Sequence, residues 1–296
     1  MPFADSLLQA SMVLIMITIG LSISSREFKE VFEKPRSLIV GLASQIILLP
    51  VLAFIILQFF DLPVGVKMGI LILSISPGGT TSNLISYLTN ARTSLSVSMT
   101  GINTAIIMFS IPFFLNLFLG HYYGGGLKSQ FDYLAVLSEL VFVIAIPVLV
   151  GLLIKSKAPK FASRSEKWFR RTGLVFLAIV FVVKVFAPSS QGGSSLTTEG
   201  ALIILPALIV FHVAALFMGL GNAKLFGVEK KSAMTIGIEV GLQNTALALL
   251  VASSVLESDI MSQPALVYAI FSFFTTAAFA LGIKKWFLKE KLSLKV

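Results

Sequence analysis

Glu239 and Gln243 place a carboxylate and a side-chain amide one helical turn apart inside an otherwise apolar run. Side chains four residues apart lie on the same face of a helix, so the two groups can share a ligand. An acid in such a run is costly to bury unless a cation neutralises it, and no lysine or arginine lies near it in the sequence. Gly241, between them, favours a helix break. These residues predict a cation site.

A second apolar run is interrupted by Pro77, Gly78 and Gly79. Proline removes a backbone donor, and each glycine costs about 1 kcal/mol relative to alanine in a helix interior, so we expect the helix to open here. The alternative is a simple kink. The residues that follow have good N-capping side chains and can begin a second half-helix, namely Thr80, Thr81, Ser82 and Asn83.

Neutral oxygens in two further apolar runs could complete a cation site. Ser96 and Thr100 lie one helical turn apart, and Gln45 is a lone amide among apolar residues. One carboxylate with hydroxyl and amide oxygens suits a monovalent cation better than calcium, and we predict sodium. The structural alternative is that the hydroxyls bond their own backbone and that Gln45 bonds a neighbouring helix. A deeply placed intramembrane acid, by contrast, is functional by default.

The elements that position these residues are predicted to be membrane-spanning helices. The 296 residues are 56% hydrophobic and only 12% charged, with a mean hydropathy of +0.94, whereas a soluble domain carries about 25% charged residues. The first apolar run has no basic residues before it, so we expect a retained helix and not a cleaved signal peptide. We predict an all-α polytopic membrane protein with about nine transmembrane helices, at residues 6–24, 37–60, 67–90, 94–119, 133–154, 171–188, 200–220, 232–253 and 263–287.

The basic residues predict how these helices are oriented. In a nine-helix arrangement all of the 23 lysines and arginines lie on one side except Lys67, Lys128 and Lys184. Lysine and arginine stay on the cytoplasmic side, so we place the N-terminus outside and the C-terminus in the cytoplasm. The membrane is expected to be a bacterial inner membrane. Lys184 is expected to snorkel to the interface, and Glu139 to reach it. The net charge of +9 is then explained by the positive-inside rule, and we expect no nucleic-acid partner.

The predicted function is secondary transport. Two interrupted helices in corresponding positions of two halves, one carrying an acid, are typical of transporters that bind ions and substrate at the membrane midplane. A sodium/proton antiporter is the main alternative, although such proteins often use two buried acids. An ATP-driven pump is disfavoured because no Walker-type loop is present. An enzyme is disfavoured because the two histidines, His121 and His212, lie in no HExxH motif and the sequence has no GxSxG motif. A receptor without transport stays open.

The sequence resembles the bile acid:sodium symporter family over nearly its whole length. Two motifs carry the resemblance, S-P-G-G-T-T-S-N at 76–83 and E-V-G-L-Q-N at 239–244. The resemblance implies two sodium ions bound where two broken helices cross. The first site would use Ser82, Asn83, Ser96, Thr100 and Glu239. The second would use Gln45, Glu239, Gln243 and the carbonyl groups of Val240 and Leu242.

The resemblance also implies inverted repeats that form a core domain, residues 34–120 and 199–290, and a panel domain, residues 1–33 and 121–198. The substrate would be an organic anion, bile-acid-like or a small carboxylate, imported with sodium by a protein that needs no oligomer. Where some bacterial members carry a His-Asn pair, this chain has Phe271-Ser272, so its substrate contacts differ. His212 is expected to be structural. The expected substrate-binding residues are Thr80, Thr81, Asn244, Thr245 and Ser272.

Overall fold

The computed structural model describes residues 3–22, 35–124, 132–188 and 191–293, and every regular element within these ranges is a helix. Several basic residues used in the topology prediction lie outside the described ranges, namely Arg26, Lys29, Lys34, Lys128 and Lys295. The first half contains α1 (Phe3–Ser22), α3 (Pro35–Ala43), the π-helical turn η1 (Ser44–Leu48), α4 (Leu49–Leu57), α5 (Val64–Ser74), α6 (Thr80–Leu88) and α7 (Thr93–Tyr123). The second contains α9 (Tyr133–Leu140), η2 (Val141–Ala145), α10 (Ile146–Lys157), α11 (Pro159–Phe186), α12 (Thr198–Leu225), α13 (Lys230–Gly241), α14 (Thr245–Leu250), η4 (Val251–Val255) and α15 (Asp259–Ser293).

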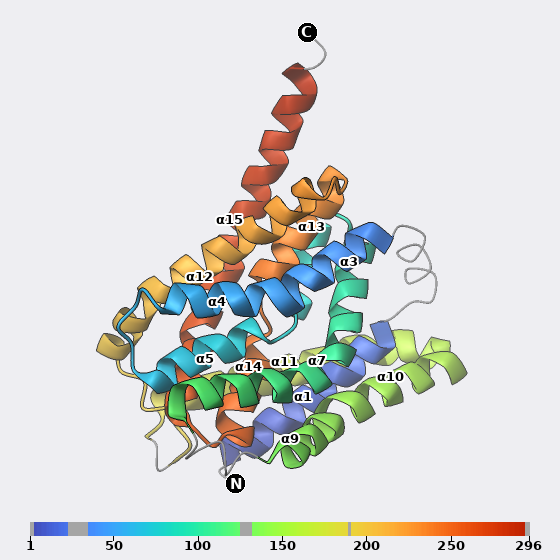
Figure 1. Ribbon diagram of the computed structural model, residues 1–296. Helices are drawn as coiled ribbons and strands as arrows, with labels where there is room; N and C mark the ends of the chain where they lie inside the picture. The colour runs from blue at the N-terminus through green and yellow to red at the C-terminus, as the bar shows by residue number, and fades with distance from the viewer. Residues whose placement is uncertain (1–2, 23–34, 125–131, 189–190, 294–296) are drawn as a thin grey trace.

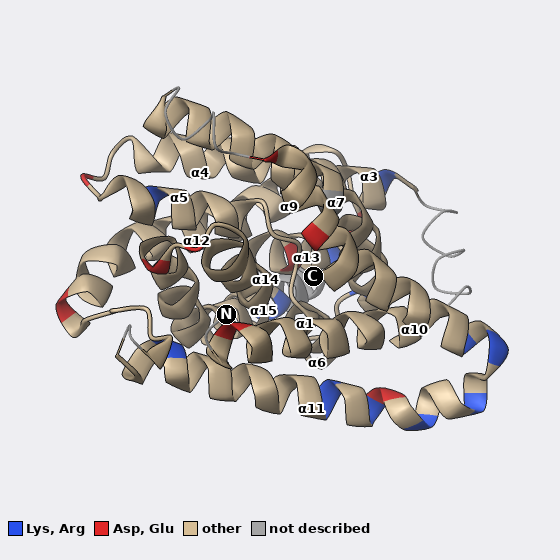
Figure 2. Ribbon diagram, turned by 90° about the horizontal axis from the view of Figure 1, so that it is seen from below, with Lys and Arg blue, Asp and Glu red and all other residues tan. Residues whose placement is uncertain are grey.

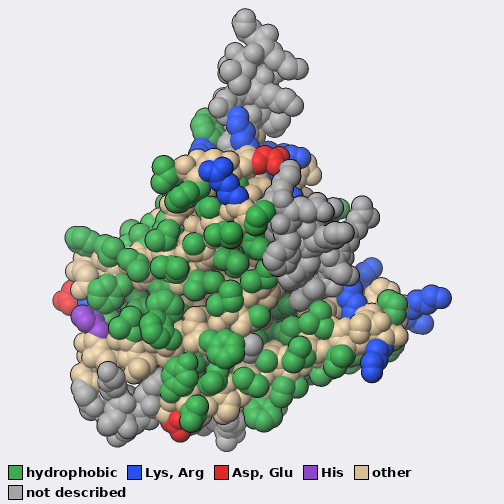
Figure 3. Space-filling view, turned by 45° about the vertical axis from the view of Figure 1, so that its right-hand side comes forward, with side chains coloured by type: hydrophobic (Ala, Val, Ile, Leu, Met, Phe, Trp, Pro, Cys, Tyr) green, Lys and Arg blue, Asp and Glu red, His purple; other side chains and the backbone are tan. Residues whose placement is uncertain are grey.

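Five stretches of the described chain are helical, long and apolar enough to cross a membrane, as the sequence predicts for them. They are Phe3–Ser22, Pro35–Leu57, Tyr133–Lys157, Thr198–Leu225 and Asp259–Trp286. Helix α7 adds a sixth if its two parts, which are bent by 60°, count as one span. Pro112 lies inside α7 and lacks the N–H that would bond the carbonyl of residue 108, which explains a bend at that level. Hydrophobic side chains cover most of the face seen in Figure 3, with basic residues toward its edges.

The remaining three predicted spans are helical but do not meet the same criterion. Two of them are divided into the shorter pairs α5–α6 and α13–α14. The third, predicted at 171–188, is the second half of α11, which begins twelve residues earlier at Pro159. The basic stretch Lys155–Arg171, predicted to be a connection, is therefore mostly helical. Pro159 suits the first turn of a helix, and Figure 2 shows basic residues concentrated along this part of α11.

Two groups of helices build the molecule. Helix α1 packs against α10 and α11, while α12 packs against α13 and α15 against α5. Figure 1 shows α1, α9 and α10 lying beside one another below α3, α4 and α12. The contact between α1 and α10 is a backbone approach, because a Cβ at Gly20 would lie 2.9 Å from the Gly151 Cα. Small residues at such positions let membrane helices pack closely.

Lys184 is buried and does not snorkel, contrary to the expectation from the sequence. Its side chain is 2% exposed, and its Nζ lies 2.9 Å from Oδ1 of Asp5 on α1. The sequence places Asp5 just outside the first predicted span, so no partner for the lysine was foreseen. The buried ammonium group of Lys184 is stabilised by its ion pair with Asp5 inside the bundle, and not by water at the membrane interface. Glu139 is half-buried, and Gln9 donates a 3.4 Å hydrogen bond to it.

Candidate functional site

The two interrupted helices meet at their breaks. Helix α5 ends at Ser74 and α6 begins at Thr80, while α13 ends at Gly241 and α14 begins at Thr245. The Gly79 N–H donates to the Leu242 carbonyl at 3.1 Å, and the Asn244 N–H donates to the Pro77 carbonyl at 2.8 Å. These bonds flank an isolated antiparallel bridge between Gly78 and Gln243. The two opened backbones thus satisfy each other, as buried peptide groups must.

The interruptions coincide with the residues expected to break the helices. Pro77, Gly78 and Gly79 lie between α5 and α6, and Gly241 is the last residue of α13. Gly78 has a second reason to be glycine, since a Cβ at this position would collide with Oε2 of Glu239. The absence of a side chain therefore allows the carboxylate to lie directly against the crossing backbones.

Glu239 lies fully buried at the crossover, among the residues predicted for the first sodium site. Its Oε1 accepts hydrogen bonds from Ser82, at 2.6 Å, and from Ser96. Its Oε2 accepts from Thr100 at 3.2 Å. Asn83 joins the cluster because its Oδ1 lies 2.7 Å from the Ser96 hydroxyl. The structure thus brings all five of these residues together from α6, α7 and α13.

This cluster holds more close oxygen pairs than hydrogens to bridge them. The Ser82 hydroxyl is 2.6 Å both from Oε1 of Glu239 and from the Gly79 carbonyl oxygen, and the Ser96 hydroxyl contacts Glu239 and Asn83 Oδ1. Each hydroxyl has one hydrogen to donate. With Glu239 ionised, turning the Asn83 amide would supply one more donor, yet the Ser82 hydroxyl would still face two acceptors. A bound cation would turn this excess of oxygens into a favourable coordination shell.

The residues predicted for the second site gather at the C-terminal end of α13, which Gln45 reaches from η1. Gln45 donates to the Glu239 carbonyl at 3.3 Å, and Gln243 donates to the Val240 carbonyl at 2.5 Å. Both amides are buried, and within the described chain neither Oε1 atom has a hydrogen-bond partner. The Leu242 carbonyl accepts the bond from Gly79. Turning the two amides by 180° would set their oxygens against these carbonyl oxygens, an arrangement that needs a cation between them.

His212 and Tyr268 hold the end of α13 from the other side. His212 Nδ1 lies 3.1 Å from the Gly241 carbonyl oxygen and 2.8 Å from the Tyr268 hydroxyl, which itself donates to the same carbonyl. The Thr275 hydroxyl lies 2.7 Å from His212 Nε2. These contacts agree with a structural role for His212. Sequence reasoning missed Tyr268, although a tyrosine within an apolar span signals a need for a hydroxyl partner.

A cavity of about 300 Å³ lies between the α1–α11 pair and the α6–α7 pair, next to the Glu239 cluster. Of the predicted substrate-binding residues, Thr80 lines it, together with Asn83 and Thr100 of the first site. The other four are not part of its lining. Asn244 caps α14 by accepting from the Leu247 N–H at 3.1 Å, and Ser272 is buried on α15. Thr81 is exposed and Thr245 half-buried.

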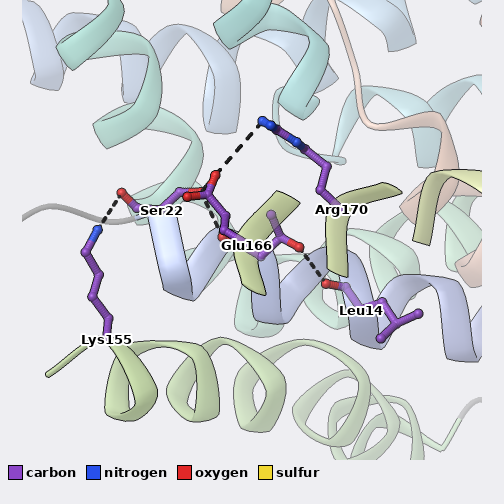
Figure 4. Close-up of polar contacts among 6 residues, drawn as sticks. Leu14, Ser22, Lys155, Glu166 and Arg170 are labelled. Atoms are coloured by element: carbon purple, nitrogen blue, oxygen red, sulfur yellow. Dashed lines mark hydrogen bonds and ion pairs between the residues drawn. The ribbon is translucent and has the colours of Figure 1, made fainter. Parts of the chain in front are cut away.

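Two charged residues in the cavity lining were not predicted as site residues. Glu166 and Arg170, one turn apart on α11, are part of the cavity lining, and Figure 4 shows the two side chains facing each other. Ser22 at the end of α1 donates to Glu166 at 3.1 Å, and Lys155 donates to the Ser22 carbonyl at 3.0 Å. In the sequence analysis Arg170 served only as a topology signal. Nothing in the spacing of the charged residues shows that α11 turns Glu166 and Arg170 toward a cavity.

Comparison with known proteins gives one family. The sequence profile of the Sodium Bile acid symporter family matches residues 10–192, which include the first broken helix. Over 257 residues the chain is 26% identical to the "Uncharacterized sodium-dependent transporter YocS" of Bacillus subtilis (strain 168), covering 87% of this chain and 76% of that protein.

Two further relatives are longer than this chain. Over 256 residues it is 25% identical to the "Probable sodium/metabolite cotransporter BASS2, chloroplastic" of Oryza sativa subsp. japonica, covering 86% of this chain and 58% of the relative. Over 234 residues it is 27% identical to the human "Hepatic sodium/bile acid cotransporter", covering 79% and 65%. The chain thus spans less than two thirds of either relative. The profile match and these relatives, together with the apolar helices, show that this multi-pass membrane protein belongs to the sodium bile acid symporter family of sodium-dependent transporters.

Proposed function

We propose that this protein is a sodium-coupled symporter that imports an organic anion, with two sodium ions bound at the helix crossover. The observation that carries the proposal is the set of buried oxygens there. Glu239 contacts three hydroxyl groups, and two amide oxygens point at no donor in the described chain. Family membership supports sodium as the ion.

Glu239 links the two proposed sodium sites. Its carboxylate belongs to the first site, with Ser82, Asn83, Ser96 and Thr100, whereas its carbonyl belongs to the second, with Gln45, Gln243 and the carbonyls of Val240 and Leu242. A first sodium ion that draws in the carboxylate also orders the turn that offers the carbonyls, so binding at one site favours binding at the other. Two sodium ions carried with one monovalent anion move net positive charge inward, so transport is electrogenic.

The proposed transport cycle moves the core against the panel. Helices α1, α10 and α11 belong to the panel, residues 1–33 and 121–198, and pack on one another. In the core, residues 34–120 and 199–290, the same order of elements occurs twice: a long helix, a broken pair and a second long helix. Inverted repeats require such a repeated order. We place nine spans in an inner membrane, with the N-terminus outside and the C-terminus in the cytoplasm. The cavity then lies between core and panel, where movement of one against the other changes access to it.

A sodium/proton antiporter is the competing function. Such a protein often exchanges ions at two buried acids, and the described chain does bury a second acid, Asp5. Asp5 is paired with Lys184 at 2.9 Å, so it is not available as a second ion-exchanging group near Glu239. The hydroxyl-rich surroundings of Glu239 also favour an ion that takes many oxygen ligands over a single proton.

Proteoliposomes separate the two functions. With an inward sodium gradient, symport predicts accumulation of a labelled organic anion and an inward positive current, with no change of luminal pH when the anion is omitted. The probes would be radiolabelled taurocholate and small hydroxy- and oxo-acids such as lactate and pyruvate, with a potassium gradient as the control. A sodium gradient that moves protons without any organic anion would instead establish the antiporter.

A further inference from the structure

The cavity beside the Glu239 cluster has a distinct chemical character at each end. Toward the crossover it offers the hydroxyl of Thr80, the amide of Asn83 and the hydroxyl of Thr100. On the α11 side its lining carries the charged pair Glu166 and Arg170. Ile19, Leu84 and Val97 contribute apolar wall between them. Its volume of about 300 Å³ is at the lower limit for ligand pockets, which range from about 300 to 1,000 Å³.

Arg170 supplies the positive charge in this lining, and it is weakly engaged. Its Nη1 lies 4.0 Å from Oε1 of Glu166, which is too long for a hydrogen bond. No hydrogen bond from its guanidinium to another described residue is formed, and its side chain is 50% exposed. The Ser22 hydroxyl lies nearer to the same Oε1, at 3.1 Å, and shares its one hydrogen between Glu166 and the Thr18 carbonyl at 2.8 Å. Figure 4 shows Glu166 lying between Ser22 and Arg170.

We propose that Arg170 binds the carboxylate of the substrate, and that the substrate is a small, polar organic anion and not one of steroid size. This inference rests on the proposed function, because it assumes that the cavity is the substrate site. A guanidinium offers two parallel donors that match a carboxylate. A cavity of about 300 Å³ suits a small molecule better than one of steroid size, and the hydroxyl and amide groups of Thr80, Asn83 and Thr100 favour a substrate with hydroxyl or oxo groups.

Glu166 takes the place of the substrate carboxylate while the cavity is empty. It is near enough to attract Arg170 across 4.0 Å, yet it keeps its bond to Ser22 when Arg170 turns to a substrate. The pair is partly exposed, so its attraction is modest and an incoming carboxylate can compete with it. Removing the charge of Glu166 should therefore strengthen anion binding, whereas removing that of Arg170 should weaken it.

Sodium and substrate meet at residues that serve both sites. Asn83 and Thr100 line the cavity and also belong to the Glu239 cluster. A sodium ion that fixes these two side chains also fixes the polar end of the substrate site, so the anion should bind more tightly with sodium than with potassium. Sodium alone should bind whatever happens at Arg170, because α11 contributes nothing to the cluster around Glu239.

The test is thermal stability of the purified full-length protein, titrated with lactate, glycerate, pyruvate and mandelate in sodium or potassium. Lactamide and pyruvamide test the need for a charge, and taurocholate tests the size limit. The variants are Arg170→Gln, Arg170→Lys and Glu166→Gln. Arg164→Gln is the matched control, since Arg164 lies on the same helix, is exposed and does not line the cavity.

We expect at least one of the small acids to stabilise the wild-type protein in sodium only, and its amide to have no effect. Arg170→Gln should weaken that response about ten- to a hundredfold, the loss of a charged hydrogen bond. Arg170→Lys should recover part of it, Arg164→Gln should leave it unchanged, and Glu166→Gln should strengthen it about two- to fivefold. The response to sodium chloride without an acid should be unchanged in every variant.

Three results would overturn the inference: an unaltered acid response in Arg170→Gln, a response to taurocholate alone, or no response to any small acid. Each leaves the proposed function intact as long as sodium, but not potassium, stabilises the wild-type protein. If sodium has no effect on the wild-type protein, the proposed function itself fails. The two failures are thus separated by one control, sodium without an acid.

Discussion

Replacing Glu239 with glutamine should abolish sodium-dependent anion uptake while the protein still folds. Glutamine keeps the shape of the side chain and an oxygen that can accept from Ser82 and Ser96, so the crossover keeps most of its hydrogen bonds. It loses the negative charge, whose attraction for a cation about 4 Å away is about 4 kcal/mol at an effective dielectric constant of 20. Sodium affinity should therefore fall about a thousandfold, as measured by uptake against external sodium concentration.

Glu239→Ala should also abolish uptake, at a greater cost in stability. It leaves the hydroxyls of Ser82, Ser96 and Thr100 without their common acceptor, and an unsatisfied buried polar group costs about 1–3 kcal/mol. Glu139→Gln is the matched control, because it makes the same acid-to-amide change at a half-buried acid of α9, away from the crossover. Undiminished uptake in Glu239→Gln, with normal uptake in the control, would refute the role of Glu239.

Gly78→Ala should disrupt the crossover and sodium binding together. The added Cβ would collide with Oε2 of Glu239, so either the carboxylate or the bridge from Gly78 to Gln243 must shift. Overpacking of this kind costs about 1–3 kcal/mol of stability. The displaced carboxylate should also remove the stabilisation by sodium, measured as the difference in melting temperature between sodium and potassium chloride.

Gly221→Ala is the control for this substitution. Gly221 lies within α12, and a Cβ there would have no neighbour within 4 Å. Alanine is favoured over glycine inside a helix by about 0.5–1 kcal/mol, so this variant should be as stable as the wild type or more so, and should keep its sodium response. A Gly78→Ala protein with an intact sodium response would show that close contact between backbone and carboxylate is unimportant.

The Glu239 cluster could be predicted because its chemistry is conspicuous in an apolar sequence. An acid, a Pro-Gly-Gly break and hydroxyls one turn apart, such as Ser96 and Thr100, all conflict with a plain membrane helix. The structure assembles them from three helices around one carboxylate. The positions of the breaks follow from the same local costs, because proline and glycine act on the backbone where they stand.

Other parts of the site depend on contacts between distant segments and have no local signal. Lys184 meets Asp5 across the bundle, and the sequence contains nothing that pairs them. Arg170 lines the cavity because α11 begins at Pro159 and continues unbroken past the charged stretch, whereas charge alone suggests a connection. Asn244 and Ser272 show the opposite case. Asn244 is polar and lies at a helix break, but it caps α14. Ser272 is polar and lies where a substrate contact was expected, but it is buried and is not part of the cavity lining.

Equilibrium binding of radioactive sodium to the purified protein tests the central claim, that the helix crossover binds two sodium ions around Glu239. The account predicts saturation at two ions per wild-type chain. Gln243→Ala removes a ligand of the second site, and Glu239→Gln removes the charge of the first while its carbonyl stays in the second. Each variant should therefore bind fewer than two ions in the concentration range that saturates the wild-type protein. An absence of saturable sodium binding to the wild-type protein, or equal binding to Glu239→Gln, would contradict the account.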